Sequence, residues 1–105
     1  HAGYLEQFPT AGLTGKYTCV EDFYLRARED AYLAGGIENG MIVVGHTPTL
    51  SKDYMMYNGG LVYQHYDPQK NCLYYDIDCG CSYRTVRANA RLACLCAETG
   101  AIYYL

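Results

Sequence analysis

The 105-residue sequence predicts an α+β fold with one N-terminal helix followed by a mostly antiparallel sheet. Apolar residues recur at every third or fourth position in one stretch of the first half, a spacing typical of an amphipathic helix. The second half instead contains short β-branched and aromatic runs separated by turn-forming residues, a pattern typical of strands. Half of the residues are hydrophobic and 18% are charged, which indicates a packed chain, and the length predicts a single domain over residues 1–105.

The predicted helix covers residues 19–34. A capping-box pattern marks its start, in which the Thr18 hydroxyl and the Glu21 carboxylate would each satisfy a free backbone N–H. Glycines at positions 35 and 36 predict its end, because glycine readily adopts the left-handed conformation that closes a helix. Residues 1–16, which glycines and Pro9 interrupt, are expected to form an irregular segment before the helix.

Five segments of the second half are expected to form strands. Residues 41–44 are a short β-branched run between two glycines, which predicts a strand buried on both faces. Residues 61–66 and 72–78 flank an Asp-Pro turn and predict a hairpin. Residues 91–96 and 101–105 flank a second turn that contains Gly100, so the sheet is expected to be mostly antiparallel.

Composition argues against two classes of partner. The net charge is −3 and no run of Lys or Arg could follow a phosphate backbone, so we expect no nucleic acid. The longest apolar run, residues 41–44, is far shorter than the roughly 20 residues of a membrane helix, so we expect no membrane span. The sequence opens with no charged and then apolar leader, so we expect a cytoplasmic protein with reduced thiols.

Four of the six cysteines form two closely spaced pairs, Cys79 with Cys81 and Cys94 with Cys96. Residues two apart on a strand point to the same side, so four thiolates could enclose a zinc ion. Alternatively, these residues are small core-facing side chains of two paired strands. The spacing alone leaves both interpretations open.

His46 is the most informative single position for chemistry. It follows a short apolar strand and Gly45, which would place an imidazole at the end of a strand where the backbone can approach closely. The alternative is a histidine in an ordinary turn. His65 lies in an alternating run instead, and we expect it to be a surface or half-buried strand residue.

Several motifs occur in one order along the chain, and they are His1-Ala2-Gly3, Leu25-Arg26-Ala27-Arg28-Glu29, Gly45-His46-Thr47-Pro48-Thr49, Ile77-Asp78-Cys79-Gly80 and Leu92-Ala93-Cys94-Leu95. Together they resemble the C-terminal half of calcineurin-like metallophosphoesterases, in the bacterial serine/threonine protein phosphatase group. The block over residues 42–49 is the most specific and is close to the final metal-ligand motif of that family. The resemblance covers nearly the whole chain and implies the C-terminal half of an α/β/β/α sandwich.

The resemblance also implies a chemistry. In that family two divalent metals, such as Mn, Fe or Zn, activate the water that hydrolyses a phosphorylated protein or a small phosphomonoester. His1 and His46 would be metal ligands, and Arg28 would bind the substrate phosphate. The family usually has an aromatic residue where this sequence has Arg26. Alternatively, His1 is the remnant of a purification tag and Arg28 is a solvated helix residue paired with a nearby carboxylate.

The earlier motifs of that family, which carry the bridging aspartate and the proton-donating histidine, have no counterpart in this sequence. We therefore expect a C-terminal fragment of a metal-dependent serine/threonine phosphatase that is inactive by itself and has no catalytic residue of its own. The alternatives are a non-catalytic module that forms homo-oligomers through an exposed sheet face, or a small zinc-binding interaction domain that uses the cysteines.

Overall fold

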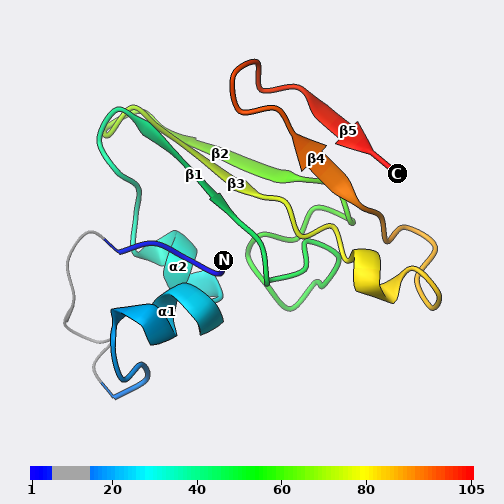
Figure 1. Cartoon of the computed structure of the whole chain (residues 1–105), viewed down its shortest axis with the longest axis horizontal. Helices are drawn as coiled ribbons and strands as arrows, with labels where there is room; N and C mark the ends of the chain where they lie inside the picture. Colours follow the sequence, from blue (N-terminus) through cyan, green and yellow to red (C-terminus); the bar gives the residue numbers. More distant parts are fainter. Residues whose placement is uncertain (6–14) are drawn as a thin grey trace.

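The computed structural model describes residues 1–5 and 15–105. It contains two short helices, α1 (Val20–Arg26) and α2 (Glu29–Leu33), where the sequence predicted one (Figure 1). The prediction of one helix over residues 19–34 is wrong because Ala27 is extended, with φ −60° and ψ 147°. The apolar spacing continues across this break because Phe23, Ala27 and Ala31 pack into the same core cluster. Most of the irregular segment expected over residues 1–16 lies outside the described residues.

The start of α1 differs from the predicted capping box by one residue. Cys19 is the N-cap and its side chain makes no capping hydrogen bond, so the helix begins one position later than expected. The Asp22 carboxylate, instead of Glu21, accepts hydrogen bonds from the Thr18 N–H at 3.0 Å and the Thr18 hydroxyl at 3.3 Å. The predicted helix end is confirmed, since Gly35 has φ +82° and donates its N–H to the Tyr32 carbonyl.

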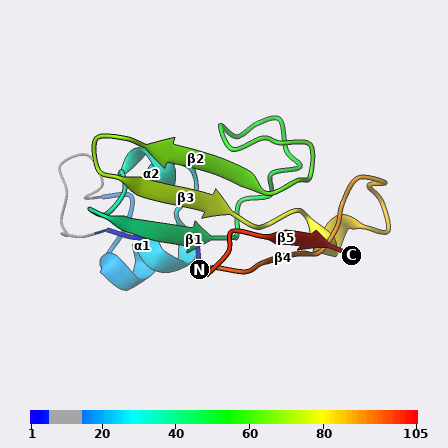
Figure 2. The same ribbon diagram turned by 90° about the horizontal axis from the view of Figure 1, so that it is seen from above.

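A three-stranded sheet has the order β1-β3-β2, with bounds β1 (Gly40–Val44), β2 (Tyr63–Asp67) and β3 (Cys72–Asp76). Strands β2 and β3 are antiparallel, which confirms the first predicted hairpin. Strand β1 is parallel to β3, with Ile42 opposite Tyr74, so this sheet is mixed rather than mostly antiparallel. Figure 2 shows the three strands side by side with β3 in the middle.

The second predicted hairpin is also confirmed, as β4 (Ala93–Leu95) and β5 (Ile102–Tyr104) pair in antiparallel fashion. A single-turn 3-10 helix, η1 (Cys81–Tyr83), lies between the three-stranded sheet and this hairpin along the chain. Figure 1 shows the helices and the β4–β5 hairpin on opposite sides of the three-stranded sheet. The described residues therefore form a small α+β domain of three layers.

Within the described residues, buried side chains form one cluster beneath the helices and one on each face of the three-stranded sheet. Tyr32 of α2 packs against the cluster that contains Ile42 and Val44. Leu95 and Ile102 of the hairpin pack against the cluster on the opposite face. The hairpin does not cover β1 completely, because Val43 is 42% exposed, so the prediction that this strand is buried on both faces is wrong. None of the helices in the described part of the chain is long and apolar enough to cross a membrane.

Candidate functional site

The two histidines implied as metal ligands, His1 and His46, lie together at the end of β1. Their ring centroids are 5.0 Å apart and their planes are inclined by 52°. The Gly45 N–H donates a 2.8 Å hydrogen bond to the His1 carbonyl. This bond ties the first residue of the chain to the residue that precedes His46, and thereby brings the two imidazoles to one place.

Small residues after His1 allow the chain to pass close to the helices. Ala2 is 1% exposed and donates its N–H to the Tyr24 carbonyl at 2.7 Å. A Cβ atom at Gly3 would lie 2.5 Å from the Ala31 Cβ and 2.9 Å from the Phe23 ring. The sequence His1-Ala2-Gly3 therefore fits this packing, since larger side chains at its second and third positions would push His1 away from His46.

His46 has a φ of +71°, in the left-handed region that few residues other than glycine adopt. Such strain is often found at functional sites, where the surrounding structure holds the residue in place. Burial, followed by the positive charge of Arg28, lowers the pKa of His46, while the charge of Asp78 acts in the opposite direction. The imidazole is thus kept neutral, which is the form that binds a metal ion.

The third implied site residue, Arg28, reaches the same place because the helix is broken at Ala27. Its Nη1 donates to the His46 carbonyl at 3.3 Å, and its guanidinium lies 5.2 Å from the centre of the Tyr54 ring. The alternative interpretation, a solvated helix residue paired with a nearby carboxylate, describes Arg26 instead, which forms an ion pair with Asp22. Arg28 forms no ion pair within the described residues.

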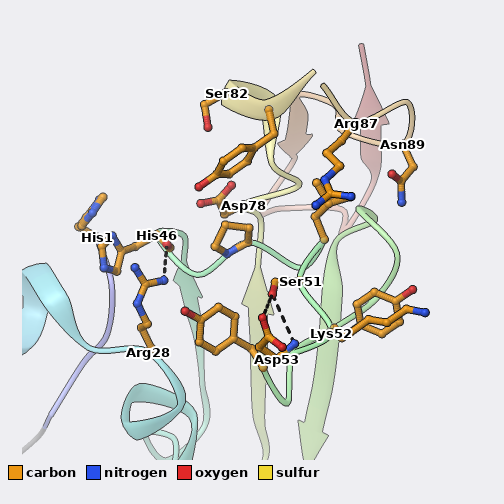
Figure 3. Close-up of a pocket in the computed structure, with 15 residues that line it drawn as sticks. His1, Arg28, His46, Ser51, Lys52, Asp53, Asp78, Ser82, Arg87 and Asn89 are labelled. Atoms are coloured by element: carbon orange, nitrogen blue, oxygen red, sulfur yellow. Dashed lines mark hydrogen bonds between the residues drawn. The ribbon is translucent and has the colours of Figure 1, made fainter. Parts of the chain in front are cut away.

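These residues line one end of a cleft of about 900 Å³ (Figure 3). Lys52, Arg87 and Asn89 lie at the opposite end, and Asp78 lies between the two ends. The Asp78 carbonyl accepts the N–H and the hydroxyl of Thr49, at 2.9 and 3.2 Å. The Asp78 motif formed part of the resemblance, but Lys52 and Arg87 were not predicted, because isolated charges in loops have no periodic pattern.

The donor set at this site fits part of a metal centre. Two imidazoles whose ring centroids are 5.0 Å apart can bind one ion, since metal–nitrogen bonds are about 2.0–2.1 Å long. Within residues 1–5 and 15–105, no three or more His, Cys, Asp or Glu side chains form a cluster that could hold a metal ion. These residues alone therefore do not supply the ligands of a closed site.

The cysteines do not form the zinc site that their spacing allowed. Cys79 is buried in the sheet core, whereas Cys94 is exposed. Among the described residues, no three cysteines, alone or with His, Asp or Glu, lie close enough together to hold a metal ion. All six thiols, each within the described part, are unpaired. His65 is an exposed residue of β2 with its ring 5.4 Å from that of Tyr32, which confirms the prediction of a strand histidine.

Comparisons with family models, with curated proteins and with solved structures find no match to this chain. The functional argument therefore depends on the residues and their geometry. Its central observation is that His1, His46 and Arg28 converge from three separate segments on one end of one cleft.

Proposed function

We propose that this chain provides the His1, His46 and Arg28 part of a two-metal phosphomonoesterase site, as the C-terminal part of a metal-dependent serine/threonine phosphatase. The substrate is a phosphorylated protein or a small phosphomonoester. One observation carries the proposal: two imidazoles converge at one end of the cleft with a guanidinium that forms no ion pair with a carboxylate of the described residues. Imidazole is a preferred ligand of Mn, Fe and Zn, and guanidinium is a preferred partner of phosphate.

His1 and His46 would hold one divalent ion. When bound, such an ion lowers the pKa of its water and so supplies a hydroxide nucleophile near neutral pH. The lowered pKa of His46 favours this role, because the ion does not have to compete with a proton on the ring. The other ligands would come from a segment outside these 105 residues, so we expect the chain to be inactive by itself.

Arg28 would bind and orient the phosphoryl group. The Tyr54 ring and the His46 carbonyl hold its guanidinium in one position. Only one of its N–H groups is used by His46, which leaves further donors for two phosphate oxygens. A guanidinium held in advance in this way loses little side-chain entropy when it binds the substrate.

Manganese binding tests the histidine part of this proposal on the chain itself. In a titration with paramagnetic Mn²⁺ followed by NMR, the ring signals of His1 and His46 should broaden first, and His65 serves as an internal control. The variant His46→Gln should lose this selective broadening. Equal broadening of all three histidines would contradict a site at the end of β1.

Activity tests the complete proposal. Co-expression with the N-terminal half of a bacterial serine/threonine phosphatase should give hydrolysis of p-nitrophenyl phosphate that requires Mn²⁺. The variants Arg28→Ala and His46→Gln should abolish this hydrolysis, whereas His65→Gln should retain it. Formation of a folded but inactive complex with Mn²⁺ present would count against the phosphatase assignment.

A separate observation favours a second candidate function, association of this chain with further copies of itself. Strand β1 is an edge strand of the described sheet, and its Val43 side chain is 42% exposed. The β4–β5 hairpin adds further exposed apolar side chains, which are Leu92, Tyr103 and Leu105. Edge strands and apolar patches of this kind promote pairing between chains. Sedimentation velocity over a range of protein concentrations tests this candidate.

A further inference from the structure

We infer that Lys52 and Arg87 form a second anion-binding subsite, at the end of the cleft opposite Arg28. This subsite would select phosphorylated peptides that carry an acidic side chain near the phosphorylated residue. The inference deepens the proposed function and rests on it, because the phosphoryl group is assigned to the Arg28 end. Figure 3 shows Lys52 and Arg87 on the far side of the cleft from the two histidines and Arg28.

The distribution of charge is the first argument. The chain is acidic overall, with a net charge of −3, yet residues 79–97 contain three arginines and no acidic residue. In the described part of the chain, Lys16 and Arg26 are the cations that form ion pairs with carboxylates. Lys52 and Arg87 form none there, although both line the cleft. Their positive charges therefore remain available to a ligand.

The loop that carries Arg87 is held in place by specific contacts. The Asn89 side-chain amide donates to the Gly59 carbonyl at 2.9 Å. The Asn89 carbonyl approaches Gly60 so closely that a Cβ atom at this glycine would lie 2.4 Å from it. The Arg87 N–H donates to the Tyr83 carbonyl at 2.9 Å. The side chain of Arg87 is thus presented to the cleft from a defined backbone.

The two neighbouring arginines do not share this position. The Arg91 guanidinium lies 5.5 Å from the centre of the Tyr104 ring, and its Nε donates to the Asn89 carbonyl. Arg84 is exposed and does not line the cleft. Arg87 is therefore the arginine of this loop that can contact a ligand in the cleft, and Arg84 offers a matched control.

Two carboxylates also line the cleft, and neither forms an ion pair with Lys52 or Arg87. The Asp53 carboxylate accepts a hydrogen bond from the Ser51 hydroxyl at 3.1 Å. The Asp78 carboxylate accepts the Gly80 N–H at 3.0 Å and acts electrostatically on His46. Lys52 instead has its ammonium group 5.8 Å from the centre of the Tyr57 ring. Within the described residues, Lys52 and Arg87 are thus not ion-paired and can contact an acidic group of a ligand.

The dimensions and lining of the cleft favour a peptide as the ligand. A cleft of about 900 Å³ is much larger than one phosphate group, and its two ends each carry cationic side chains. Pro48 and tyrosines 54, 57 and 83 also line it, and such rings pack well against the backbone and side chains of a peptide. A peptide with a phosphoserine and a nearby carboxylate would contact both ends, whereas free phosphate would contact one.

The test compares two fluorescent phosphoserine peptides of equal length, one with aspartates and one with alanines beside the phosphoserine. Binding to the full 105-residue chain is measured by fluorescence anisotropy at low ionic strength, where exposed charges act most strongly. We expect the acidic peptide to bind about fivefold more tightly, as exposed ion pairs typically allow. The double variant Lys52→Ala/Arg87→Ala should reduce this ratio to about one without changing the affinity for the alanine peptide.

The control variant Arg84→Ala removes one charge from the same loop outside the cleft and should preserve the ratio. An unchanged ratio in the double variant, or an equal loss in the control, would overturn the inference. Failure of the proposed function gives a different result: the acidic peptide would bind equally well without its phosphate and to the variant Arg28→Ala. In that outcome the subsite would stand and the phosphatase assignment would not.

Discussion

Replacement of His46 by glycine should stabilise the folded chain although it removes a proposed metal ligand. A left-handed conformation costs a residue with a Cβ atom about 1–2 kcal/mol, and His46 has a φ of +71°. Glycine avoids this cost but loses about 0.5–1 kcal/mol through the greater entropy of the unfolded chain. The Arg28 hydrogen bond survives because it is made to the backbone carbonyl of this residue. The net expected gain is about 0.5–1 kcal/mol in the free energy of unfolding.

Urea denaturation followed by far-UV circular dichroism measures this gain. The matched control is His65→Gly, the same substitution in the extended strand β2, where it should destabilise the chain by about 1 kcal/mol. Opposite signs for the two variants would show that the site stores backbone strain. The reasoning is refuted if His46→Gly lowers the free energy of unfolding as much as the control does.

Three further substitutions test other parts of the structure. Gly3→Ala would place a Cβ atom 2.5 Å from that of Ala31, so it should lower the free energy of unfolding by about 1–3 kcal/mol in urea denaturation. Gly45→Ala, whose Cβ would have its nearest neighbour at 3.8 Å, is the control, and equal losses would contradict the packing argument. Burial raises the pKa of Asp76 to about 7, so its contribution to stability is complete below the ordinary pKa of 3.8 and is lost as the pH rises through 7. Asp76→Asn should remove a decline of about 1.4 kcal/mol per pH unit between the ordinary pKa of 3.8 and the raised pKa of about 7, and a decline of equal slope in the variant would assign it to another group. Val43→Lys on the edge strand should weaken self-association in sedimentation velocity, and a wild-type chain that stays monomeric at high concentration would exclude this association.

Local sequence patterns predicted the elements whose limits depend on local chemistry. Both hairpins and the helix end at Gly35 follow from turn residues and from the freedom of glycine. The break at Ala27 could not be predicted, because the helical spacing continues across it into the same core. The parallel pairing of β1 with β3 was also missed, since register between segments so far apart depends on tertiary packing.

The candidate site was only partly accessible from the sequence. His46 stood out because of its position after a glycine and a strand, but His1 and Arg28 came from the family resemblance and not from spacing. Their convergence depends on the bond between Gly45 and His1 and on the helix break, and neither has a local pattern. Lys52 and Arg87 were missed because exposed loop charges acquire meaning only when the fold places them on one cleft.

The break between α1 and α2 has an evolutionary consequence. Ala27 is completely buried, so the packing of the core sets the direction in which Arg28 leaves the backbone. Changes in volume at Phe23 or Ala31 would therefore shift the affinity of the proposed phosphate site although neither residue lines the cleft. A mutational scan would score such core positions as functional. Substitutions at these buried core positions could then change the preference of the proposed site during evolution, while every side chain that lines the cleft stays the same.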